Sequence, residues 1–165
     1  MQNRMKIKTG TVIFVIKNGK ILLAKKTRVL GIGKWNGYGG GFDPKVDKTQ
    51  EDCAVREFQE ESNGAKIKKE FLDKVAVITF HNGNVLEFTV HFYIANNIIG
   101  MPKTSDEMND PTWFPLDKLP DWDQFMESDK IWMPRILEGE KIKGDVWNRD
   151  DFSLIAHNIN TVESF

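Results

Sequence analysis

The 165-residue sequence contains a single cysteine, Cys53, and this scarcity excludes two classes of structure. A disulfide framework within the chain needs paired cysteines, and a cysteine-rich zinc site needs several. Cys53 stands among acidic and apolar residues in a stretch of helical character, where a lone thiol usually packs as a small hydrophobic group. We therefore expect a buried, unreactive thiol and a reducing, cytoplasmic setting for the protein.

Net charge and long apolar runs are also nearly absent. The 23 Lys and Arg residues balance 24 Asp and Glu residues, which leaves a formal net charge of −1. This balance provides no electrostatic footprint for a nucleic-acid polymer or an anionic membrane. No apolar run approaches the length of a membrane span, and the N-terminus lacks the apolar core of a signal peptide. The composition is that of a soluble globular protein. It does not determine the oligomeric state, and we expect either a monomer or a homodimer.

Apolar segments separated by turn residues predict two β-hairpins, one around Asn18-Gly19 and one around residues 81–84. A helix is predicted from about residue 50 to residue 62. Thr49 is its expected N-cap, with Asp52 three residues later in the manner of a capping box. Asn63 and the glycine after it are its expected end.

The rest of the chain adds a helix in the segment SDKIWMPRILEG and short strands in GDVWN and DFSLIAH. Residues 27–48 carry six glycines and residues 100–130 carry four prolines, so both are predicted to be loops. Hairpin, glycine loop, helix, hairpin, helix and strands in this order indicate one α+β domain, residues 1–165, built around a mixed β-sheet.

The segment REFQEESNG places Glu57, Glu60 and Glu61 on one face of the first predicted helix, because positions i, i+3 and i+4 are neighbours there. Carboxylates this close repel each other unless cations lie between them. Oxygen ligands at this spacing suit Mg²⁺ or Mn²⁺, which share coordination with substrate phosphates and promote phosphoanhydride hydrolysis. Taken alone, the cluster fits better a solvated helix face on which Arg56 pairs with its acidic neighbours.

The glycine run YGGGF lies just upstream of these carboxylates, and the order GG…REFQEE resembles the Nudix box, G-x5-E-x7-R-E-U-x-E-E-x-G-U, where U is a bulky aliphatic residue. Residues 56–61 match the R-E-U-x-E-E core at every position, with an aromatic residue in the apolar slot. The resemblance implies a Nudix fold, an α/β/α sandwich around a mixed sheet, and a hydrolase that uses Mg²⁺, with Mn²⁺ as an alternative. It assigns Glu57, Glu60 and Glu61 to the metal and gives Arg56 an orienting role.

Two positions and one spacing depart from the box. Lys48 stands where the box has its first glutamate, and the spacing from Gly40 to Lys48 is about two residues longer than usual. Asn63 stands where the box has glycine, a mild change because asparagine tolerates the left-handed conformation. Lys48 inverts a charge at the edge of the site, so we expect altered support for Arg56 rather than lost chemistry.

Outside the box, LGIGKWNGYGGGF, SDEM and WFPLDKLP resemble the MutT-type enzymes of this family. Those enzymes hydrolyse (deoxy)nucleoside triphosphates, including oxidised purine nucleotides such as 8-oxo-dGTP, to the monophosphate and pyrophosphate. The resemblance implies that Gly39 or Gly40 offers a backbone carbonyl to a metal ion. It also implies that Glu107 lies opposite the acidic helix as a further metal ligand or as the general base.

The same resemblance assigns residues to the base of the nucleotide. Asn36 would hydrogen-bond the purine edge, and Leu30 and Phe80 would form walls of the base pocket. Without the resemblance, Asn36 is more simply a turn residue before Gly37, and Phe80 is ordinary strand core.

The remaining base-reading positions match less well. Met126 stands where the family has a tryptophan on which the base stacks. Asp129 matches the second of two paired aspartates, but Ser128 takes the first position. Because one residue is inserted upstream, these roles could instead fall to Asp121, Trp122 or Asp123. Triphosphate chemistry is therefore better supported than a preference for oxidised guanine.

Two rival functions stay open. The extension at residues 43–47 could reshape the phosphate path toward another diphosphate substrate, such as a dinucleoside polyphosphate or a nucleotide sugar. Lys48 and Asn63 raise the alternative of a non-catalytic nucleotide-binding regulator.

Overall fold

The structure is a computed structural model, and it describes residues 8–28, 30–83 and 86–165. A nine-stranded mixed sheet follows the order β11-β10-β6-β7-β1-β2-β3, with β4 paired to β1 and β9 paired to β2. The elements are β1 Lys8–Lys17, β2 Lys20–Lys26, β3 Trp35–Asn36, β4 Tyr38–Gly41, α1 Gln50–Ser62, β5 Ala65–Lys66, η1 Lys69–Phe71, β6 Leu72–Asn82, β7 Leu86–Ala95, β8 Ile99–Gly100, β9 Met108–Pro115, η2 Trp122–Gln124, α2 Asp129–Leu137, β10 Lys141–Asn148 and β11 Leu154–Val162.

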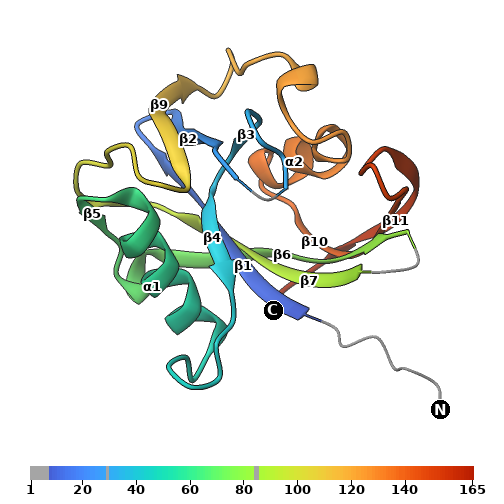
Figure 1. Cartoon of the computed structure of the whole chain (residues 1–165), viewed down its shortest axis with the longest axis horizontal. Coiled ribbons are helices and arrows are strands. Elements are labelled where there is room, and N and C mark those ends of the chain that lie inside the picture. Colours follow the sequence, from blue (N-terminus) through green and yellow to red (C-terminus); the bar gives the residue numbers. More distant parts are fainter. Residues whose placement is uncertain (1–7, 29, 84–85) are drawn as a thin grey trace.

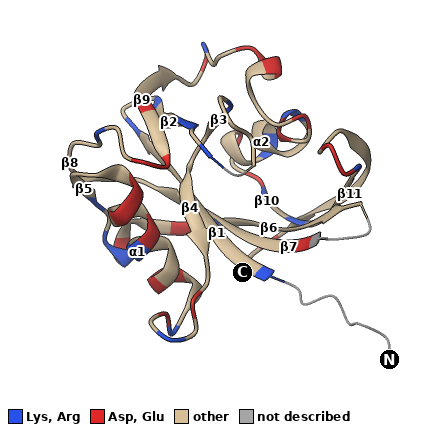
Figure 2. Cartoon of the chain, viewed as in Figure 1, with Lys and Arg blue, Asp and Glu red and all other residues tan. Residues whose placement is uncertain are grey.

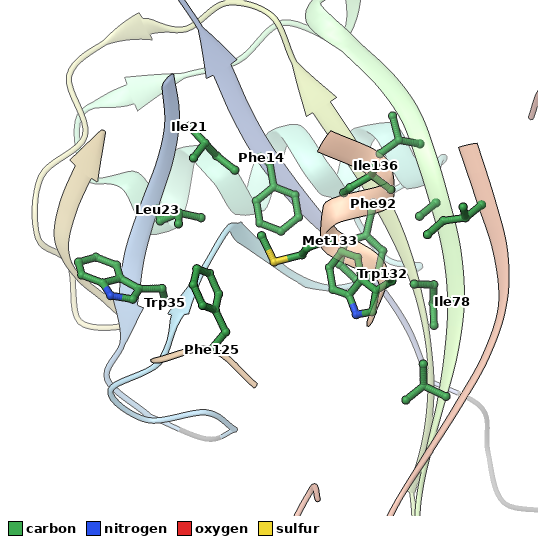
Figure 3. Close-up of a cluster of buried hydrophobic side chains, with 14 residues drawn as sticks. Phe14, Ile21, Leu23, Trp35, Ile78, Phe92, Phe125, Trp132, Met133 and Ile136 are labelled. Atoms are coloured by element: carbon green, nitrogen blue, oxygen red, sulfur yellow. The ribbon is translucent and has the colours of Figure 1, made fainter. Parts of the chain in front are cut away.

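The two α-helices cover opposite faces of the sheet (Figure 1). Side chains alternate along a strand, so consecutive residues of β1 face different helices. Ile13 and Val15 pack into one buried cluster with Phe58 of α1. Phe14, between them, packs into a second cluster with Trp132 of α2, which Figure 3 shows together with other members of this core. The predicted α/β/α sandwich is confirmed.

The sheet is mixed because β1 and β7 run parallel, as do β6 and β10, while the remaining pairs are antiparallel. The first predicted hairpin is confirmed: Asn18 and Gly19 both have positive φ, as a tight turn requires. β6 and β7 form the second antiparallel pair, although positions 84–85 of its turn lie outside the described residues.

The first helix has the predicted bounds, and its caps explain why. Thr49 Oγ1 accepts a hydrogen bond from Asp52 N at 3.1 Å, while Asp52 Oδ2 accepts one from Thr49 N at 3.1 Å. Asn63 ends the helix in the left-handed conformation, with φ 47°. Cys53 is fully buried in this helix, and burial raises the pKa of its thiol to about 11, as expected of a packing residue.

The prediction that residues 27–48 and 100–130 are loops was wrong in part, because both segments contain strands. Residues 27–48 contain β3 and β4, and the glycines that indicated a loop serve a strand that needs close backbone approach: a Cβ on Gly39 would lie 1.8 Å from Thr11 O. Residues 100–130 contain β9, whose two prolines are tolerated because it pairs with β2 alone among the described strands. No helix in the described part of the chain is long and apolar enough to cross a membrane.

Candidate active site

Helix α1 lies directly against β4, so its carboxylates meet the glycine strand. Gly39 N donates a hydrogen bond to Glu61 Oε2 at 3.1 Å. A Cβ on Gly40 would lie 2.4 Å from Glu57 Cδ, so only glycine leaves room for that carboxylate. Glu60 is exposed at the rim of the same face. Figure 2 shows acidic positions recurring along α1. The fold therefore brings the predicted glycines and glutamates together.

Arg56 is held by a carboxylate that the sequence did not single out. Its Nε and Nη2 donate to the two carboxylate oxygens of Asp47 at 2.9 and 2.7 Å. Its Nη1 donates to Glu57 Oε1 at 2.8 Å, and Nη2 also reaches Gly41 O at 3.2 Å. Asp47 is buried, and its hydrogen bonds with Arg56 lower the pKa of the carboxyl to about 2. Arg56 is thus supported by Asp47 in place of the glutamate that the box has at position 48.

The extended spacing before α1 explains why Asp47, and not residue 48, holds Arg56. With the extra residues, the acidic side chain is that of Asp47, one place before Lys48. The turn formed by residues 43–47 directs this carboxylate toward Arg56. Lys48 itself is exposed, and its backbone N–H donates to Asp52. Alignment by position alone therefore missed Asp47; the signal was the two-residue extension combined with an aspartate beside the mismatched lysine.

Glu107 reaches the acidic helix from the segment before β9. It forms an ion pair with Arg28, a residue that the sequence also did not indicate. Burial and the neighbouring Glu107 carboxyl raise the pKa of Glu61 to about 8. Hydrogen bonds with Glu61 and Arg28 lower the pKa of Glu107. Two residues 46 positions apart in the chain thus influence each other's pKa, and the role of Glu107 as metal ligand or general base stays a prediction.

The donor set fits a divalent cation. Burial raises the pKa of both Glu57 and Glu61, so a positive charge between these carboxylates would relieve an unfavourable arrangement. Their oxygens and the backbone of Gly39 and Gly40 are the hard ligands that Mg²⁺ prefers. Within the described residues no group of three or more His, Cys, Asp or Glu side chains is arranged to hold a metal ion, so these carboxylates would need backbone, water or substrate oxygens to complete a site. An open set suits an ion that keeps waters and shares ligands with a substrate.

Of the predicted base-binding residues, Met126 and Asp129 lie together beside the loop of Leu30, whereas Phe80 lies apart from them in the core. Met126 N donates to Asp129 Oδ2 at 3.2 Å, and a Cβ on Gly31 would lie 2.9 Å from Met126 Sδ, which brings the loop of Leu30 beside Met126. Burial raises the pKa of Asp129 to about 7. Phe80 packs in the core against Phe92, with ring centroids 6.3 Å apart.

Asn36 is a strand residue, the last of β3, and pairs with Ala24 of β2. Its Oδ1 accepts a hydrogen bond from Gly37 N at 2.8 Å, which leaves the amide NH₂ as the group for any further partner. It is half-buried on β3, next to the glycine strand. The strand position therefore does not match the interpretation of Asn36 as a turn residue, and the amide NH₂ keeps a donor available for the base-binding role, which stays a prediction.

An open pocket of about 460 Å³ lies between the segment that leads into α2 and the turn from β10 to β11. Met126 and Phe125 line one wall, and Phe152 and Ser153 line the other. Its rim also contains Trp122, Asp123, Lys34 and Lys130. Of the alternative base-reading residues, Trp122 and Asp123 are therefore beside Met126 in space.

Comparison with known proteins agrees with this geometry. The family model described as NUDIX domain matches residues 7–136. The oxidized purine nucleoside triphosphate hydrolase of Mus musculus is 34% identical over 156 residues, which cover 94% of this chain and 96% of that protein. Its namesake from Danio rerio is 34% identical over 154 residues, covering 93% of this chain and 94% of that protein.

A solved structure shows the same fold. The crystal structure of a mutator MutT protein from Bacillus halodurans superposes with a TM-score of 0.78 at 19% identity, covering 93% of this chain and 98% of that one. Sequence match, fold and the meeting of α1 with the glycine strand agree. The chain therefore belongs to the Nudix family of hydrolases.

Proposed function

We propose that this protein is a Mg²⁺-dependent nucleoside triphosphate pyrophosphohydrolase that converts oxidised purine nucleotides, such as 8-oxo-dGTP, to the monophosphate and pyrophosphate. The observation that carries this proposal is the meeting of Glu57 and Glu61 with the glycine strand, with Glu107 opposite them. The named activity of two relatives that align over almost the whole chain supports the substrate class.

The metal-binding roles follow from the donor set. Nudix hydrolases generally use divalent metal ions. Glu57, Glu60 and Glu61 would hold Mg²⁺ (or Mn²⁺), together with the carbonyl of Gly39 and the carboxylate of Glu107. A bound metal ion would supply charge neutralisation at the phosphates and would lower the pKa of a water that attacks phosphorus in line.

The remaining chemistry belongs to side chains of this protein. Arg56 fixes the Glu57 carboxylate through its 2.8 Å hydrogen bond, so that this group keeps its orientation through a turnover. Glu107, or one of the helix carboxylates, accepts the proton of the attacking water at a carboxylate oxygen. Burial raises the pKa of Glu61 when no cation lies beside it, and a bound Mg²⁺ would favour the ionised carboxylate that serves as its ligand.

The nucleobase would lie at the other end of the site. Asn36 would donate to the base edge, and Met126, Leu30 and Phe80 would supply apolar walls. Asp129, with a pKa near 7, would exchange a hydrogen-bond donor for an acceptor within the physiological range. We also propose that the chain is one domain, since β10 and β11 continue the same sheet. A cytoplasmic location and a monomer or homodimer stay predictions.

The test is a screen of ordinary and oxidised nucleoside triphosphates with Mg²⁺, with products identified by chromatography. We expect one monophosphate and one pyrophosphate per turnover, and a higher kcat/KM for an oxidised purine than for its parent. Inertness toward every triphosphate would disprove the proposal. Turnover of dinucleoside polyphosphates or nucleotide sugars alone would move the protein to another Nudix activity, and binding without turnover would make it a regulator.

A further inference from the structure

Two buried asparagines lie side by side where β6 and β10 end. Asn82 and Asn148 are register partners in the parallel pairing of these strands, and each is 5% exposed. Asn148 Nδ2 donates to Asn82 Oδ1 at 3.0 Å. Both continue the face on which Ile78 and Val146 belong to the core beneath α2. The pair of side-chain amides therefore lies on the face of the sheet that α2 covers, in line with the apolar core residues of β6 and β10.

This amide pair is not satisfied. Asn148 Oδ1 is buried and has no hydrogen-bond partner among the described residues. The indole nitrogen of Trp132, a residue of α2 that packs against the sheet, is likewise buried without a hydrogen-bond partner among the described residues. In Figure 3 this nitrogen lies on the side of the ring away from Ile136. An acceptor buried without a partner is costly, and such groups in native proteins commonly await a ligand or a water.

The unsatisfied acceptor belongs to the end of the molecule where the base is proposed to bind. Asn148 directly precedes the turn whose Phe152 and Ser153 line the 460 Å³ pocket opposite Met126. Asn82 follows Phe80 by two residues on the same face of β6. The turn that follows Asn148 thus forms one side of the pocket that Met126 bounds on the other.

We propose that Asn82 and Asn148 are specificity-determining residues, in which the Asn148 carbonyl accepts a hydrogen bond from an exocyclic amino group of the purine. This inference rests on the proposed function, because it assigns the base. Asn82 holds the Asn148 amide by accepting from its Nδ2, so that the carbonyl faces the ligand. A site that bonds an N–H group rejects an analogue lacking it, because the buried acceptor is then left unpaired.

The experiment measures binding and not turnover. Dissociation constants are obtained by calorimetry, with chelator present, for nucleoside monophosphates that differ by one exocyclic amino group: guanosine against inosine, and adenosine against purine riboside. We expect the wild-type protein to prefer the amino-bearing member of at least one pair by about 10-fold or more. In Asn148→Leu this preference falls to within about 2-fold, while affinity for the member without the amino group is retained or increased.

Asn158→Leu is the matched control, because Asn158 is exposed on β11 beside Asp145 and should leave every dissociation constant unchanged. If Asn148→Leu does not fold, as judged by its thermal unfolding, Asn148→Val is used with the same expectations, since valine suits a strand. The proposal is overturned if the wild type shows no preference within either pair. It is equally overturned if the Asn148 variant weakens both members of each pair by the same factor, as a purely structural pair would.

The two proposals fail separately. A base preference that depends on Asn148 in a protein that hydrolyses no triphosphate would keep this inference and remove the catalytic one. Triphosphate hydrolysis with a base preference insensitive to Asn148 would do the reverse.

Discussion

At the scale of single residues, the ion pair between Arg56 and Asp47 replaces the one expected from the family pattern. Asp47 presents both carboxylate oxygens to the guanidinium, an arrangement that adds directional hydrogen bonds to charge attraction. Its carboxylate side chain is only 1% exposed, whereas that of Arg56 is 26% exposed. Removal of the carboxylate would therefore leave a partly buried cation without its main partner.

We expect Asp47→Ala to lower the free energy of unfolding by about 1–3 kcal/mol, because it removes a charged hydrogen-bond partner from a partly buried group. The turnover number should also fall, since Arg56 positions Glu57. Urea unfolding and steady-state kinetics measure the two effects. Lys48→Ala is the control and should change neither quantity. A larger loss of stability and turnover in Lys48→Ala than in Asp47→Ala would show that residue 48 supports Arg56, as the family pattern has it.

The same ion pair predicts a pH dependence. The pKa of Asp47 is about 2 in the folded protein and about 3.9 in an unfolded chain. A carboxyl whose pKa is depressed by folding contributes stability above its unfolded pKa and loses it as the pH falls through the folded value. The difference in unfolding free energy between wild type and Asp47→Asn should therefore be constant above about pH 5 and shrink toward pH 2. A difference that does not change over this range would contradict the assignment.

At the scale of elements, β4 shows why three consecutive glycines precede the helix. The glycines are not equivalent: Gly39 lies against the backbone of β1, Gly40 lies against the Glu57 carboxylate, and Gly41 faces open space. One strand therefore combines a structural contact with a contact to the site. Substitution of each glycine by alanine separates these contributions.

Gly40→Ala should fold with a modest loss of stability, because the group it meets is the end of a flexible side chain, yet lose activity by about 10-fold or more as Glu57 is displaced. Gly39→Ala should destabilise strongly, since its methyl group would overlap the Thr11 carbonyl. Gly41→Ala should be neutral. Thermal unfolding and kcat/KM distinguish the three variants, and equal effects in all would show that β4 does not lie as described.

At the scale of the whole molecule, the sheet brings together parts of the chain that are far apart in sequence. The acidic helix, the segment before β9 and the glycine strand meet at one end of α1. A site assembled from three elements is completed only in the folded protein. A ligand that binds it must therefore stabilise the fold.

Mg²⁺ at about 100 times its dissociation constant should stabilise the chelator-treated protein by about 2.7 kcal/mol, visible as a rise in Tm. Glu61→Gln should abolish this rise and reduce turnover by about 10²-fold or more, because a neutral amide is a poor Mg²⁺ ligand. Exposed Glu163→Gln serves as the control. A Mg²⁺-induced rise in Tm that is unchanged in Glu61→Gln would place the metal elsewhere.

The sequence by itself determined the features that depend on neighbouring residues. The bounds of α1 follow from its capping box and from Asn63, and the first hairpin follows from Asn18 and Gly19. The spacing of Glu57 and Glu61 along one helix face likewise needs only the helical repeat. Local geometry decides these features because the interacting groups are separated by a few bonds.

Only the tertiary structure decided the rest. β9 is a strand because β2 offers it a partner, although its own composition favours a loop. Asp47, and not position 48, holds Arg56 because an extended turn redirects its side chain. Glu107, just before β9, meets Glu61 of α1, and Asn148 meets Asn82 through the pairing of β10 with β6; in both cases the two residues are distant in the chain. Such contacts depend on how the whole sheet is assembled, which no short stretch of sequence specifies.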